Sequence, residues 1–219
     1  MAGIILIDDD FATLALDAQL SGRIPPVRDG GQVYGVEPDA ASITGGGSNT
    51  IKFNVIGASF KIPMSAENLG VQLVYNDNGV NELIHIFLRD SQPTVSNRYG
   101  YWVRFETRAF GGTSGFFRIA SVNNYSSVAL YPDITWTFAS SGINKVAFEC
   151  NANNFRVIIN DVVANTFTDT TWPPNGSRNK CGVYYTTTGI SASRGTRFTI
   201  FDSIVIPLSS VEYPIVRFG

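Results

Sequence analysis

The feature that most constrains the fold of this chain is an alternation of apolar and polar residues with a period of two. In residues 82–89, Ile84, Ile86 and Leu88 fall on one side of an extended chain. Successive side chains of a β-strand point to opposite faces, so this period is typical of strands that bury one face. Residues 99–108 repeat it, with an apolar side and a mixed aromatic and charged side. Both segments are therefore predicted to be strands.

Further strands are expected where similar runs lie between turn-forming residues. These runs are residues 50–56, 69–75, 116–122, 144–150, 155–160, 182–187 and 196–206. Clusters of Asn, Asp, Gly and Pro between them favour tight turns. Helical spacing is found at residues 10–22, where a short helix competes with an irregular loop. Many strands joined by turns predict an all-β sandwich or barrel.

Composition indicates one large domain and excludes several partners. The 219 residues are 44% hydrophobic and 16% charged, which suits a packed core rather than disorder. The net charge is −2, whereas nucleic-acid binders gain affinity by clustering Lys and Arg against phosphates. No run reaches the roughly 18 apolar residues of a membrane helix, and Met1 is not followed by a signal-peptide pattern. We therefore expect neither a nucleic-acid partner nor a membrane partner.

Short motifs mark both ends of the chain. The N-terminal motif residues are Asp9-Asp10-Phe11, Leu20-Ser21-Gly22-Arg23, Pro25 or Pro26, and Gly30-Gly31. These residues, the hairpin-like run 155–163 and the closing run 196–206 resemble concanavalin A-like, or laminin G-like, jelly-roll domains of the kind found in bacteriophage structural proteins. Two positions depart from that pattern. Val33-Tyr34 stands where the family usually has Trp, and Asp161 stands where Gly is commoner.

The resemblance implies a two-sheet antiparallel jelly-roll sandwich of concanavalin A-like fold over residues 1–207. The apolar residues 208–219 are expected to form a C-terminal arm or an added strand. The resemblance also implies a non-enzymatic virion structural protein, made in the host cytoplasm, as capsid decoration or as a tail or baseplate component. Its partners would be other virion proteins and further copies of itself. The alternative is a lectin-like module that recognises a host surface glycan, and a glycoside hydrolase is a distant third.

The mixed sides of the first two strands carry candidate carbohydrate-binding residues. They are His85, Phe87, Arg89, Trp102, Arg104 and Glu106. If the two strands pair, these side chains form a patch of aromatic and charged groups on one sheet. Aromatic rings stack on sugar rings, and charged groups form hydrogen bonds with hydroxyls. In the competing interpretation, the aromatic rings pack beneath a covering loop.

The sequence offers little support for catalysis. A retaining glycosidase needs two carboxyl groups facing one cleft, about 5 to 5.5 Å apart. The residues after Glu106 and those after Glu149 supply no second carboxylate on the same strand. His85 is the only histidine, and no Gly-x-Ser-x-Gly motif provides a nucleophile for it. We therefore expect no catalytic residues.

No cofactor or metal site is predicted, although calcium stays an alternative. Cys150 and Cys181 lack the spacing of a zinc site, and they either pair as a disulfide or remain buried thiols. Oxygen ligands of the kind that Ca²⁺ prefers are offered by the turn at 76–78 and by Asp8, Asp9 and Asp10. Such side chains also bind their own backbone in turns, which is the competing interpretation.

Overall fold

The regular structure in the described part of the chain consists of β-strands. The computed structural model describes residues 4–11, 18–19, 24–28, 35–37, 41–44, 50–53, 58–64, 68–77, 82–90, 99–107, 114–123, 126–138, 142–173, 175, 178, 180–187 and 194–202. Every regular element in these residues is a strand, which confirms the all-β class. The arm expected at 208–219 lies outside the described residues. The sequence analysis left a short helix open at residues 10–22. Within that segment, residues 18–19 form a strand and residues 12–17 lie outside the described part.

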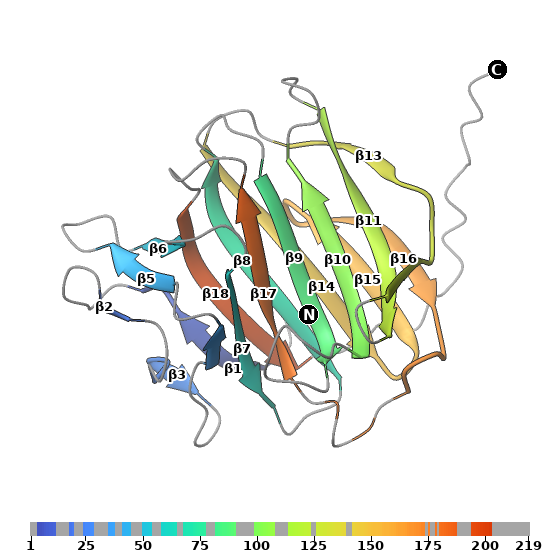
Figure 1. Cartoon of the computed structure of the whole chain (residues 1–219), viewed down its shortest axis with the longest axis horizontal. Helices are drawn as coiled ribbons and strands as arrows, with labels where there is room; N and C mark the ends of the chain where they lie inside the picture. The colour runs from blue at the N-terminus through green and yellow to red at the C-terminus, as the bar shows by residue number, and fades with distance from the viewer. Residues whose placement is uncertain are drawn as a thin grey trace.

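Two antiparallel sheets form a sandwich (Figure 1). Within the described residues, sheet A has the strand order β16 (Val162–Thr168), β15 (Asn154–Ile159), β14 (Gly142–Asn151), β8 (Leu69–Asp77), β18 (Arg194–Asp202), β6 (Thr50–Phe53), β5 (Ala41–Thr44) and β2 (Ala18–Gln19). Next to this row, β1 (Ile5–Asp9) pairs with β18, and β3 (Val27–Arg28) pairs with β1.

Sheet B covers one face of sheet A. Its strand order in the described residues is β12 (Ser126–Ala129), β11 (Ser114–Asn123), β10 (Tyr99–Glu106), β9 (Glu82–Asp90), β17 (Lys180–Thr187), β7 (Ala58–Pro63) and β4 (Gly35–Glu37). One further strand, β13 (Ile134–Thr137), pairs with the half of β11 that β12 leaves uncovered.

Neighbouring strands are often distant in sequence. In sheet A, β8 lies between β14 and β18, and in sheet B, β17 lies between β7 and β9. Such crossovers belong to a jelly roll rather than to a meander of consecutive hairpins. The long strands of both sheets run in roughly the same direction in Figure 1, which is the aligned packing of a β-sandwich.

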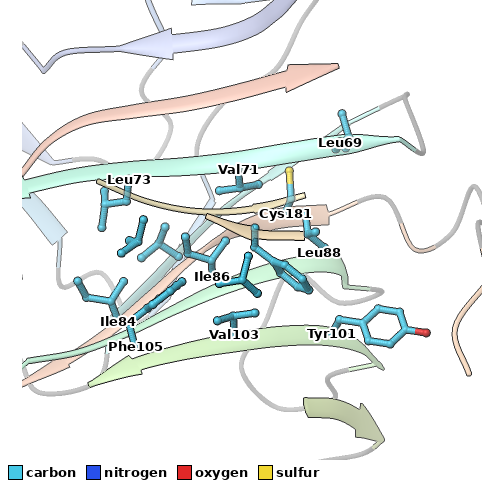
Figure 2. Close-up of a cluster of buried hydrophobic side chains, with 14 of the residues drawn as sticks. Leu69, Val71, Leu73, Ile84, Ile86, Leu88, Tyr101, Val103, Phe105 and Cys181 are labelled. Atoms are coloured by element: carbon cyan, nitrogen blue, oxygen red, sulfur yellow. The ribbon is translucent and has the colours of Figure 1, made fainter. Parts of the chain in front are cut away.

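The core lies between the inner faces of the two sheets. Figure 2 shows apolar side chains of β8, β9 and β10 filling this space. In the runs 144–150 and 155–160 of the sequence, alternation predicts one core-facing side, made of Val146, Phe148, Phe155, Val157 and Ile159. These five residues are at most 1% exposed. Phe155 stacks on Phe167 with ring centroids 4.8 Å apart and planes 10° apart. The predicted inner faces of β14 and β15 are confirmed.

Two of the motifs that carry the sequence resemblance have structural explanations. Phe11, two residues after β1, is buried with a left-handed backbone (φ 57°), and its N–H donates to Asp9 Oδ1 at 2.8 Å. The β15–β16 hairpin turns at Asn160 and Asp161, both with positive φ, as tight two-residue hairpin turns require. Asp161 therefore adopts the conformation for which the family more often uses Gly.

We expect Phe148→Ala to destabilise the domain by about 3 to 5 kcal/mol, because it leaves a cavity beside the rings of Phe155 and Phe167, which Phe148 contacts. Urea unfolding of the whole chain measures this loss. Val128→Ala is the matched control, since Val128 is an exposed apolar residue and its truncation should cost well under about 1 kcal/mol. Equal losses in the two variants would contradict this assignment of the core.

Candidate functional site

The two strands that carry the candidate residues are neighbours in sheet B, as the sequence analysis anticipated. β9 pairs with β10 so that His85 lies opposite Arg104 and Phe87 lies opposite Trp102. Glu106 continues the same face of β10, opposite Leu83. Five of the six candidate residues therefore share the outer face of sheet B, which is the face directed away from sheet A.

Arg89 is the exception, and its assignment to the patch is wrong. Its backbone is left-handed (φ 55°), and opposite it the pairing of β9 with β17 is irregular between Lys180 and Gly182. An extra residue at such a bulge interrupts the alternation of side chains. The Arg89 side chain is consequently buried, with its guanidinium 5.3 Å from the ring centroid of Phe155 in sheet A.

Buried Arg89 links the two sheets at one end of the sandwich. Its Nη1 donates to the carbonyl oxygen of Trp172 at 3.1 Å, and its Nη2 donates to the carbonyl oxygen of Ala152. Nearby, Tyr101 Oη donates to Asp169 Oδ1 at 2.6 Å and accepts from the N–H of Trp172 at 2.9 Å. This network holds the segment after β16 against sheet B and has a structural role.

The protonation states of this network follow from its contacts. Burial and the hydrogen bond to Asp169 raise the pKa of Tyr101 above its usual range. Burial alone would raise the pKa of Asp169, but hydrogen bonds from Tyr101 and Thr171 outweigh it and hold that pKa below its ordinary value. At neutral pH, Asp169 is therefore an acceptor and Tyr101 a neutral donor.

The aromatic members of the patch are covered. Phe87 is 2% exposed and Trp102 is 8% exposed, and they form a small apolar cluster with Ala120 and Val122 of β11. His85 stacks on Trp102 with ring centroids 5.0 Å apart. For Phe87 and Trp102, the structure therefore supports the competing interpretation, in which the aromatic rings are packed and not open to solvent.

Among the described side chains of the outer face, partly exposed charged groups lie on β10, on β11 and in the turn before β13. Arg104 Nη2 is 3.3 Å from Glu106 Oε2, and these side chains are 25% and 18% exposed. Arg118 donates from Nε and Nη2 to the two oxygens of Asp133, at 2.5 and 2.7 Å. These side chains are 38% and 36% exposed.

Phe116 completes this arrangement, because the Arg104 guanidinium lies 5.5 Å from its ring centroid. We call these five residues the outer-face cluster; its members are Arg104, Glu106, Phe116, Arg118 and Asp133. The sequence analysis missed three of them. Alternation in the strand 116–122 could have placed Phe116 and Arg118 on one face, but nothing in the sequence brings Asp133 to Arg118, which lies two strands earlier.

Electrostatic interactions connect the two ion pairs of the outer-face cluster. The hydrogen bonds from Arg118 hold the pKa of Asp133 below its usual range, with a smaller contribution from the charge of Arg104. The pKa of Arg118 is raised in turn, chiefly by Asp133 and also by Glu106. The cluster is therefore a set of mutually neutralised charges, with the Asp133 carboxylate held ionised.

Two of the candidate calcium ligands at the N-terminus, Asp8 and Asp9, accept hydrogen bonds from groups of this chain. Asp8 accepts hydrogen bonds from Arg197 and Thr199 on the outer face of sheet A. The buried Asp9 carboxylate accepts from Phe11 N–H on the opposite side of β1 from Asp8. The side chains of the turn at 76–78 lie outside the described residues. Among the side chains that are described, no three or more His, Cys, Asp or Glu gather into a metal-binding group.

The two cysteines are buried thiols on facing sheets and are not joined in a disulfide. Burial raises the pKa of both the Cys150 and the Cys181 thiol, which keeps them protonated at neutral pH.

No helix long and apolar enough to cross a membrane occurs in the part of the chain that the structure describes.

Comparison with known proteins identifies the fold. No protein family model and no curated protein sequence matches the chain. Among solved structures, LamAcat from Zobellia galactanivorans is 10% identical and has a TM-score of 0.54, with 90% of this chain and 97% of that chain covered. The Ca²⁺-bound exoplasmic/lumenal domain of VIP36 is 11% identical with a TM-score of 0.53, over 87% of this chain and 91% of that one.

These similarities, together with the two antiparallel sheets, confirm the concanavalin A-like jelly-roll sandwich. At such low identity they establish the fold alone. A LamA variant was solved in complex with laminaritriose and laminaritetraose, and VIP36 was solved with Man3GlcNAc bound. What those proteins bind is a property of those proteins.

We expect Trp102→Ala to lower the free energy of unfolding by about 3 kcal/mol, because the ring is packed against Phe87 and stacked by His85. Trp102→Phe, which keeps an aromatic ring in place, should cost distinctly less. Urea unfolding of both variants measures the difference. If Trp102→Ala unfolds at the same urea concentration as the parent, the ring lies at an open surface and the packing described above is wrong.

Proposed function

We propose that this chain is a non-enzymatic carbohydrate-binding module that contacts its ligand through the outer-face cluster of sheet B. The observation that carries the proposal is the pair of partly exposed guanidinium–carboxylate contacts beside the ring of Phe116. Binding sites for small ligands combine apolar surface with a few fixed polar groups that set the ligand's orientation. The cluster offers both on adjacent strands.

The chemistry of a sugar fits this surface. Each hydroxyl of a sugar both donates and accepts, whereas a guanidinium only donates and an ionised carboxylate only accepts. Arg118 uses Nε and Nη2 for Asp133, which leaves the donors on its Nη1 outside that pair. An aromatic ring such as that of Phe116 packs against the C–H groups of a sugar. The ion pairs also hold both kinds of polar group in place before a ligand arrives, which lowers the entropic cost of binding.

The similarity to carbohydrate-binding proteins supports this reading only through the fold. The LamA and VIP36 complexes contain bound sugars, and both proteins share the sandwich of this chain. One fold carries many functions, so the residues of the outer-face cluster bear the argument.

A glycosidase is a weaker candidate because of the state of the carboxylates in the cluster. A general acid in glycoside hydrolysis needs a raised pKa, so that it is protonated when it meets the leaving group. Arg118 lowers the pKa of Asp133 instead, and Glu106 lies in contact with Arg104. We therefore propose binding without turnover.

Replacing Arg104 by Ala should weaken glycan binding at least about tenfold, because it removes a charge-assisted donor and the cation above Phe116. A printed glycan array finds ligands for the whole chain, and calorimetry then compares the variants. Lys145→Ala is the matched control, since it breaks an exposed ion pair with Asp161 away from sheet B. Unaltered affinity in Arg104→Ala, or no bound glycan on the array, would contradict the proposal, and sugar release on incubation would make the protein an enzyme.

A structural role in a bacteriophage particle is the second candidate. It rests on the N-terminal resemblance, and a group of exposed apolar side chains on and beside β1 and β3 favours it. These side chains are Ile4, Ile5, Ile24 and Val27. In the described residues β3 pairs with β1 alone, so these side chains lie near a sheet edge. Apolar surface at such an edge favours protein contacts. We propose that a second copy of this chain covers it.

Sedimentation analysis of the whole chain tests this second candidate. The parent should self-associate, and Val27→Asp should shift it towards the monomer because a charge is then buried in the contact. Val128→Asp, at an exposed apolar position on sheet B, is the control and should leave association unchanged. A monomeric parent would argue against the virion role in this form.

A further inference from the structure

The charged groups of the outer-face cluster are paired, so that their charges balance. Two arginines and two carboxylates lie within one small area, and each arginine contacts one carboxylate. The formal charges of the four groups cancel. Arg104 and Arg118 lie directly opposite each other in the pairing of β10 with β11, so like charges would repel without their carboxylate partners.

We propose that the outer-face cluster selects neutral saccharides and rejects anionic ones such as sulfated sugars and uronates. This inference rests on the carbohydrate-binding function proposed above and specifies the ligand class of the same site. Asp133 and Glu106 are the specificity-determining groups, because each occupies the arginine that an anionic ligand would otherwise bind.

The geometry of the Arg118–Asp133 pair explains the rejection of anions. Both carboxylate oxygens of Asp133 accept from Arg118, one from Nε and one from Nη2. This two-point contact is the one that a sulfate or a sugar carboxylate would make. An anionic ligand must therefore displace Asp133 or approach it, and the two negative charges repel at that distance.

Neutral hydroxyls meet no such penalty. A hydroxyl accepts from the remaining N–H groups of an arginine and donates to a carboxylate oxygen, so it can join an ion pair without breaking it. Phe116 adds an uncharged surface beside Arg104. Because the four charges cancel, neutral ligands should also bind with little dependence on ionic strength, whereas ligands held by unpaired charges lose affinity as salt screens them.

The test uses an array on which each neutral tri- or tetrasaccharide is matched by its 6-O-sulfated and uronate forms. For the whole chain, the neutral form of a bound saccharide should bind at least about tenfold more tightly than its anionic counterparts. Its affinity should change less than about twofold between about 50 and 300 mM NaCl.

Asp133→Asn provides the sharper comparison. It keeps the size of the side chain but releases the guanidinium of Arg118, so the sulfated and uronate forms should gain about tenfold in affinity, and salt should weaken this new binding. Glu106→Gln should act in the same direction at Arg104, which keeps the test informative if one variant folds poorly. Asp161→Asn is the control, because it releases the exposed Lys145 away from sheet B and should leave the selectivity unchanged.

The possible outcomes distinguish a failure of the inferred selectivity from a failure of the proposed carbohydrate-binding function. If anionic saccharides bind the parent more tightly than neutral ones, and Arg104→Ala abolishes that binding, the site binds carbohydrate but the inferred selectivity is wrong. If both carboxylate variants keep the selectivity of the parent, Asp133 and Glu106 do not determine it, and the inference also fails. If no saccharide of either class binds the parent, the carbohydrate-binding function itself is refuted.

Discussion

The register between β9 and β10 determines which of their side chains face the core and which lie on the outer face of sheet B. It pairs Ile86 with Val103 on the inner face and Phe87 with Trp102 on the outer face. A slip of one residue would exchange the two faces and expose side chains whose burial is worth about 1.5 to 3 kcal/mol each. The core between the sheets therefore determines which side chains of β10 reach the outer surface, including Arg104 and Glu106.

A bulge on the other side of β9, in its pairing with β17, adds a polar link between the two sheets. At Arg89 the extra residue of a bulge turns a long cationic side chain from the outer face into the interior. There it donates to two carbonyl groups and lies over the ring of Phe155. A buried charge is costly unless hydrogen bonds compensate it, and these acceptors provide the compensation. Because of the bulge, the Arg89 side chain joins the two sheets and does not belong to the outer-face cluster.

The outer face of sheet B divides into an apolar part and a polar part with different roles. Phe87 and Trp102 are buried and stabilise the sheet, whereas Arg104, Glu106, Arg118 and Asp133 are partly exposed to solvent. The pairing of the four charges keeps a charge-rich surface neutral and ordered. A preorganised surface of this kind suits the recognition of hydroxyl groups, whose binding energy per contact is small and is easily lost to side-chain entropy.

The alternation of apolar residues was sufficient to predict the all-β class and the strands β8, β9, β10, β11, β14, β15 and β17, although not β1 or β7. It also predicted the inner faces of β14 and β15 and the shared face of His85, Trp102, Arg104 and Glu106. Alternation is a local property of an extended chain, so it can be read along the sequence. Three features depended on contacts between distant segments: the reversal of Arg89 at a bulge opposite β17, the covering of Trp102, and the approach of Asp133 to Arg118. Each is decided by which strands and turns become neighbours, and a periodicity along the chain carries no information about that pairing.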